Sequence, residues 1–66
     1  MKMMMVEGMK VPTVLTALCQ YGATSFLVED DRSGSGTWLI TLEERPENLS
    51  VEALVIETFQ LPWRQI

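Results

Sequence analysis

Apolar and polar residues alternate most clearly in two short segments near the middle of the chain, 24–29 and 37–44. The residues that share one face are Thr24, Phe26 and Val28 in the first segment and Trp38, Ile40 and Leu42 in the second. Alternation of this kind, with β-branched and aromatic residues on the apolar face, is typical of half-buried strands. The acidic, glycine-spaced residues between the segments favour a turn, so we expect a central β-hairpin.

The segment 12–21 has the spacing of a helix. Pro12 suits the first helical position, and Gly22 suits the left-handed residue that ends a helix. The apolar residues cover roughly 200° of this helix, which is wider than the stripe of an ordinary surface helix. We therefore expect two contacts to cover it, one of them with the sheet. Cys19 lies in the apolar arc and is predicted to be a buried, unreactive thiol, because the sequence has no His and no cation beside it.

The segment 50–61 predicts a second helix. Its main apolar stripe consists of Val51, Val55, Ile56 and Phe59. Ser50 is the expected N-cap, with Asn48 as its rival. Pro46 is expected to end the preceding strand because proline cannot donate to a ladder. A strand over 51–61 stays open as an alternative, since this segment is rich in strand-forming residues.

The methionine-rich start of the chain is ambiguous, because methionine falls on both faces of any strand placed there. Residues 3–9 are either a first strand or a frayed end. Assembled, the elements predict one α+β domain, in which a small antiparallel sheet packs both helices on one face. A hairpin alone would be barely stable, so a third strand would help to complete the sheet.

The length and composition of the chain point to a need for additional stabilising contacts. A chain of 66 residues forms a single small domain, and one cysteine excludes an intrachain disulfide. One cysteine without any His also argues against a structural zinc site. We therefore expect self-association or a protein partner. The net charge of −4, with only dispersed basic residues, argues against general binding of nucleic acid.

Sequence signals for export or membrane insertion are weak. Glu7 and Lys10 interrupt the apolar segment that a secretory signal would need, and Leu18 before Cys19 does not fit a lipoprotein cleavage site. No apolar run reaches the roughly 18 residues of a membrane span. The single cysteine is typical of a reducing compartment, so we expect a cytoplasmic protein that does not bind membranes.

The acidic tip of the hairpin partly resembles a calcium-binding loop. With Glu29 as the first position, Gly34 falls on the sixth, as in an EF-hand loop. Ile40 then occupies the twelfth position, where such a loop needs a bidentate glutamate, so a solvated turn is favoured over a metal site. The segment 33–36 is either a native turn or an inserted flexible linker. The sequence predicts no metal site and no cofactor.

Catalytic motifs are missing from the sequence. There is no His to act as a base for a Ser, Thr or Cys nucleophile. Glu43 and Glu44 are adjacent on a strand and point to opposite faces, so they cannot act as an acid–base pair. Gly36 leads into a strand, whereas a phosphate-binding loop needs a following Lys and a helix. We therefore expect a protein without enzymatic activity.

Interaction with another protein is the best remaining function, and we expect a small acidic regulator or inhibitor. The candidate contact residues are Tyr21, Glu29, Asp30, Asp31, Leu54, Leu61 and Trp63. Leu27 and Leu39, on the outer face of the hairpin, give weaker evidence of a second contact surface. The alternatives are a structural homodimer joined through helix faces and an ion-binding hairpin. Compact acidic chains are frequent among phage-encoded modulators, an analogy that rests on size and charge alone.

Overall fold

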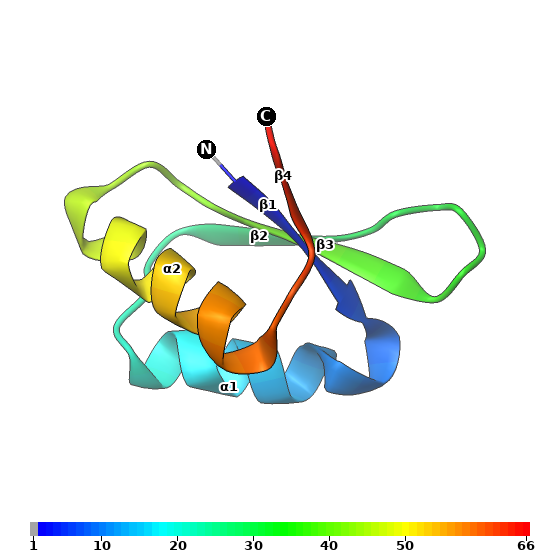
Figure 1. The fold of residues 1–66 in the computed structure, drawn as a ribbon, viewed down its shortest axis with the longest axis horizontal. Coiled ribbons are helices and arrows are strands. Elements are labelled where there is room, and N and C mark those ends of the chain that lie inside the picture. Colours follow the sequence, from blue (N-terminus) through cyan, green and yellow to red (C-terminus); the bar gives the residue numbers. More distant parts are fainter. Residues whose placement is uncertain (1) are drawn as a thin grey trace.

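The computed structural model describes residues 2–66, which form one α+β domain (Figure 1). Over these residues the chain contains four strands, two α-helices and one turn of 3₁₀ helix, Gly8–Lys10. The elements in chain order are β1 (Lys2–Glu7), α1 (Val11–Gln20), β2 (Phe26–Asp30), β3 (Thr37–Leu42), α2 (Pro46–Phe59) and β4 (Trp63–Gln65). Both helices lie on the same side of the sheet, as predicted (Figure 1).

The four strands form one antiparallel sheet in the order β2-β3-β1-β4. Val28 pairs with Ile40, Ile40 with Met4, and Met4 with Trp63, so these residues form one row across the sheet. β3 thus lies between β1 and β2, which run parallel to each other. This element order with a split crossover is the arrangement of ferredoxin-like domains. Such a fold carries many functions, so it indicates none by itself.

The ambiguous start of the chain is a central strand. β1 pairs with β3 on one side and with β4 on the other. Met4 and Val6 are fully buried, whereas Met3 and Met5 on the opposite face are half-buried. The 3₁₀ turn then leads into α1. Gly8 belongs to this turn: a Cβ there would lie 3.1 Å from the carbonyl oxygen of Gly36 and crowd it.

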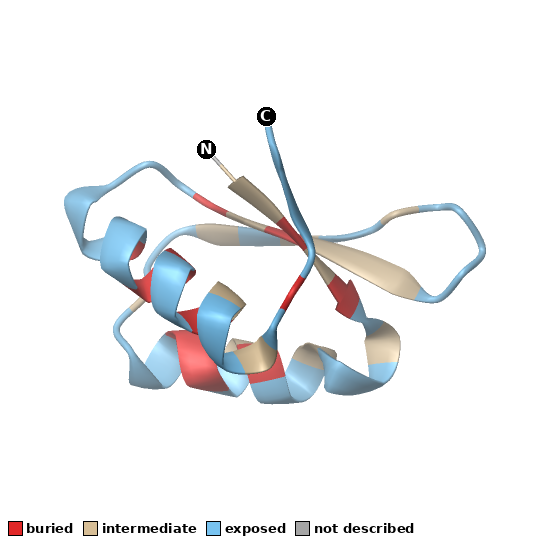
Figure 2. Ribbon diagram, viewed as in Figure 1, coloured by how far each residue is buried: buried red, intermediate tan, exposed pale blue. Residues whose placement is uncertain are grey.

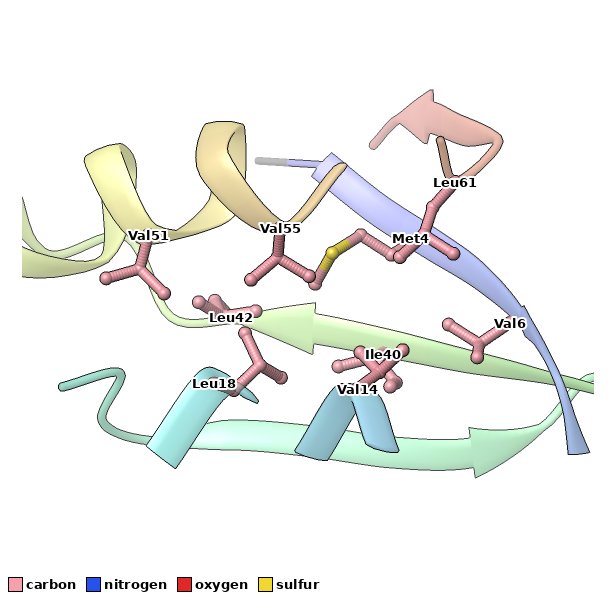
Figure 3. Close-up of a cluster of buried hydrophobic side chains, with 9 residues drawn as sticks. All are labelled: Met4, Val6, Val14, Leu18, Ile40, Leu42, Val51, Val55 and Leu61. Carbon is pink, nitrogen blue, oxygen red and sulfur yellow. The ribbon is translucent and has the colours of Figure 1, made fainter. Parts of the chain in front are cut away.

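The core lies between the sheet and the two helices. Its buried side chains come from β1, β3, α1, α2 and the segment after α2, and they point toward one another (Figure 3). They are Met4, Val6, Val14, Leu18, Ile40, Leu42, Val51, Val55 and Leu61. Phe26, Val28 and Phe59 pack against this cluster. The main stripe of the second helix is therefore confirmed, and so is the inner face of the hairpin at Phe26, Val28, Ile40 and Leu42. The other two residues predicted for that face differ: Thr24 precedes β2 and is exposed, and Trp38 is half-buried.

Helix α1 begins and ends close to the predicted residues. Gly22 has φ +86°, and the N–H of Ala23 donates to the carbonyl of Leu18 at 2.9 Å, which closes the last turn. Val14, Ala17 and Leu18 are the buried residues of this helix, and Figure 2 shows buried positions on both helices. The prediction that Cys19 is buried is wrong, because this side chain is exposed. Ten residues present only a narrow stripe to the core, so the edge of the apolar arc faces solvent.

The segment read as either helix or strand is helical, and α2 begins four residues earlier than predicted. Pro46 occupies the first turn of the helix, so it starts α2 rather than only ending a strand. Ser50 and Asn48 both lie inside the helix, which makes the N-cap prediction wrong. Arg45 is the N-cap and makes no capping hydrogen bond through its side chain. The backbone N–H of Asn48 instead donates to the carbonyl of Arg45 at 2.9 Å.

Candidate protein-interaction surface

The side of the sheet away from the helices carries a mixed apolar and charged surface. Strand register places Leu27, Thr41, Met3 and Arg64 side by side in one row across all four strands. Glu29, Leu39 and Met5 form the neighbouring row. Met3, Met5 and Leu39 are half-buried, whereas Leu27 remains 57% exposed. We call this surface the helix-free face.

A shallow, open groove of about 460 Å³ crosses one end of the helix-free face. The residues that line it are Met3, Ser25, Phe26, Leu27, Glu29, Thr41, Leu42, Glu43 and Ile66. Apolar side chains dominate its floor, and Ile66 at the chain end is 61% exposed. A groove of this kind offers an apolar contact for a side chain of another molecule.

The two charged residues that line the groove, Glu29 and Glu43, are both acidic, and two arginines lie near them. Glu29 is exposed, and Glu43 forms a surface ion pair with Arg45, with 3.2 Å between Nε and Oε2. The guanidinium of Arg64 lies over β1, where Nη2 donates to Sδ of Met5 at 3.6 Å. Surface ion pairs contribute little to stability, so Glu43 can exchange Arg45 for another cation at small cost. The rim is therefore suited to a basic ligand.

Strand β2 forms one edge of the sheet. The N–H of Asp31 donates to Thr37 at 3.1 Å, and the carbonyl of Ser25 accepts from Glu43 at 3.0 Å. Odd-numbered residues of this segment therefore bond to β3. The backbone groups of Phe26, Val28 and Asp30 consequently point away from β3, to an edge where no strand of residues 2–66 pairs.

The acidic tip of the hairpin is a hydrogen-bonded turn. One carboxylate oxygen of Asp30 accepts from the N–H of Arg32 at 2.8 Å, and Asp31 accepts from both the N–H and the hydroxyl of Ser33. The bonds from Ser33 lower the pKa of Asp31 below its usual value. Within residues 2–66, no three His, Cys, Asp or Glu side chains gather as metal ligands would. Gly36 accepts a bond from the N–H of Gly8 at 2.8 Å, which ties the end of this turn to the domain.

The predicted contact residues do not form one surface. Leu61 is only 7% exposed and belongs to the core, which is inconsistent with its predicted role in binding. Tyr21 and Leu54 are about half exposed, one at the end of α1 and the other on α2. Trp63 is 45% exposed on β4, beneath the ammonium group of Lys2, which lies 4.5 Å from the ring centre.

The three acidic candidates, Glu29, Asp30 and Asp31, lie at the end of β2, at the border of the helix-free face. Of the other groove residues, Leu27 was predicted only as weaker evidence of a second contact surface, and Met3 and Ile66 were not predicted as contact residues. The alternation in the hairpin already placed Leu27 on the outer face. Met3 and Ile66 became recognisable only once β1 and β4 were seen to complete the sheet.

Comparison of the chain with family models, with curated proteins and with solved structures found no match. No helix among residues 2–66 combines the length and the apolar character needed to cross a membrane.

Proposed function

We propose that this chain is a small, non-catalytic interaction module that regulates or inhibits another protein by binding it through the helix-free face. The observation that supports this proposal is the apolar groove on that face, lined by Leu27, Met3 and Ile66 beside an acidic rim. Both helices pack on the other side, so no helix of residues 2–66 covers this groove (Figure 1). A partner protein that covers it would bury apolar surface, which favours association.

Nucleic acid is a less suitable ligand for this face. Sheet surfaces that bind RNA stack bases on aromatic side chains and attract phosphates with cations. On the helix-free face, the described strand positions hold aliphatic, methionine, threonine and charged residues, and Arg64 is their one basic residue. Phe26, Trp38 and Trp63 belong to the rows on the helix side. We accordingly favour a protein partner and, with the single cysteine, a cytoplasmic setting.

Affinity capture from the native host tests the proposal with two matched variants. Leu27→Asp places a charge at the groove, whereas Leu49→Asp makes the same change at a 63% exposed position on α2. We expect one specific partner to be captured by the parent chain and by Leu49→Asp, and to be lost with Leu27→Asp. Equal capture by both variants, or no specific partner in any experiment, would contradict the proposal.

A homodimer that uses the same face is the second candidate. It is favoured by the small size of the domain, since short chains often gain stability by association. The helix faces proposed for such a dimer from the sequence are less suitable, because α1 buries Val14, Ala17 and Leu18 within its own domain. Light scattering at micromolar concentration separates the candidates: a dimer that Leu27→Asp dissociates supports self-association, and a monomer argues against it.

A further inference from the structure

We propose that the partner contributes a β-strand, basic at one end and apolar at the other, which pairs with the free edge of β2 and extends the sheet. This inference rests on the proposed function and specifies the chemistry of the partner. Addition of a strand to an exposed sheet edge is a recurrent mode of recognition, in which backbone bonds give affinity and alternate side chains give specificity. The other edge strand, β4, has only three residues and offers a shorter edge.

The backbone of β2 already has the required orientation. Phe26, Val28 and Asp30 direct their N–H and C=O groups away from β3, while Leu27 and Glu29 pair with Thr41 and Leu39. An incoming strand can therefore bond to three alternate residues without disturbing the β2–β3 ladder. The groove lies beside Leu27, so a side chain of the incoming strand on this side reaches apolar surface.

The side chains along β2 define what the partner strand should carry. Its first half presents Phe26 and Leu27, and its second half presents Glu29 and Asp30, with Asp31 directly after them. Cross-strand neighbours of opposite charge stabilise pairing, as do apolar neighbours. An antiparallel partner strand should therefore begin with basic residues and end with apolar ones. Arg32 reduces the negative charge of this end of the edge but does not reverse it.

A second copy of the chain fits the edge less well. Antiparallel pairing of two β2 strands centred on Val28 would set Glu29 of each copy beside Leu27 of the other. Each carboxylate would then lose water without gaining a cation, which is unfavourable. A basic strand instead places a cation beside Glu29. Charge complementarity therefore distinguishes a basic partner from self-association.

Synthetic peptides provide the direct test with the whole chain. The probe is an acetylated, amidated peptide of about six residues, the usual length of a strand, with Lys-Arg-Lys followed by Val-Thr-Val. One control peptide carries N-methyl groups on the alternate residues whose N–H groups would donate to β2. This change removes the backbone donors and keeps the charges. A second control replaces the basic residues by Glu. Backbone amide NMR shifts and hydrogen exchange report binding residue by residue.

We expect the basic peptide to slow exchange at the amides of Phe26, Val28 and Asp30, with smaller effects at Leu27 and Glu29. N-methylation and charge reversal should each weaken binding by at least about tenfold. The variant Glu29→Lys should weaken it in the same way, whereas Glu57→Lys on the exposed side of α2 should not.

Three results would overturn strand addition. They are unchanged amides over 26–30 at millimolar peptide, equal binding of the N-methylated peptide, and a dimer of the free chain joined through β2. If any of these occurs while Leu27→Asp still abolishes capture of the partner, the interaction function stands and only the mode of binding is wrong. If Leu27→Asp also leaves capture intact, both proposals fail.

Discussion

Asn48 joins three segments through one buried side-chain amide. Its Oδ1 accepts from the N–H of Thr24 at 2.9 Å, and its Nδ2 donates to the carbonyls of Thr24 at 2.7 Å and Glu43 at 2.9 Å. The side chain is 2% exposed, so these bonds replace water for groups that cannot reach it. The sequence indicated Asn48 only as a rival N-cap, because nothing in local spacing reveals bonds to a residue 24 positions away.

Removing this amide should destabilise the domain. Asn48→Ala leaves one backbone donor and two carbonyls without their partner, and we expect a loss of about 2–3 kcal/mol in the free energy of unfolding. Ser50→Ala is the matched control, because Ser50 is exposed on the same helix and should change stability by no more than about 0.5 kcal/mol. Urea denaturation measures both values. Equal stability of the two variants would show that the bonds of Asn48 to Thr24 and Glu43 do not stabilise the domain.

At the scale of elements, the clearest predictions from sequence were those with a strong period or a marked end. The predicted limits of the hairpin strands and of α1 were close to the observed ones. In β3, apolar residues such as Ile40 and Leu42 alternate with outward-facing residues, and Gly22 marks the end of α1. β1 could not be decided, since methionine on both faces hides the period. β4 has three residues, too few to show one, and its place depends on pairing with β1. Pro46 was misjudged because the same residue suits a strand end and a helix start.

The two helices end in the same geometry with different residues. Each helix is followed by one left-handed residue, Gly22 after α1 and Gln60 after α2. The next residue, Ala23 or Leu61, then donates its N–H to a carbonyl five residues earlier. Leu61 donates to the carbonyl of Ile56 at 3.0 Å. Gln60 has φ +52°, which strains a residue that carries a Cβ. A left-handed residue at Gln60 was not predicted, since glutamine rarely adopts this conformation.

Substitutions at these two left-handed positions should change the free energy of unfolding in opposite directions. Gln60→Gly relieves the strain and should raise the free energy of unfolding by about 0.5–1 kcal/mol, net of the greater freedom of glycine in the unfolded chain. Gly22→Ala introduces the same strain and should lower it by about 1 kcal/mol. Urea midpoints at unchanged m-value provide the measurement. A loss of stability in Gln60→Gly would mean that the glutamine side chain makes a contact of greater value.

At the scale of the whole molecule, a chain of this size can cover only one face of its sheet. Domains of about 60 residues bury roughly 60% of the surface of the unfolded chain. The sequence could predict a small acidic domain with uncovered apolar residues. It could not predict which residues remain uncovered. Leu61 and Leu27 are both apolar, and only the packing of the helices on one face of the sheet decides which of them is buried. Leu61 enters the core and Leu27 does not.

One acidic residue of the molecule, Glu52, is buried. Its side chain is 8% exposed on α2, and it lines a cleft of about 160 Å³ together with Lys2 and Glu44. Burial raises the pKa of Glu52 above its ordinary value of 4.5. The charge of Lys2 acts in the opposite direction and Glu44 in the same direction, but loss of water is the largest cause.

This raised pKa makes the stability of the domain depend on pH. Between pH 4.5 and the higher pKa of the folded state, the folded chain binds more protons at Glu52 than the unfolded chain, so stability falls as the pH rises through this window. Asp31 has a lowered pKa and acts in the reverse sense, but only as the pH falls below 3.8. The two effects therefore occur in separate ranges.

Glu52→Gln should remove this loss, because an amide of similar shape carries no charge into the buried site. We expect the variant to be more stable than the parent chain at pH 7 and equal to it within error near pH 4. Between these values its free energy of unfolding should change less with pH than that of the parent chain. Glu57→Gln removes the same charge from the exposed side of α2 and controls for the net charge of −4. Urea denaturation at several pH values gives the three curves. A parent chain whose stability rises from pH 4.5 to 7 by more than that of Glu52→Gln would contradict the raised pKa, because a carboxylate stabilised in the folded state produces that slope.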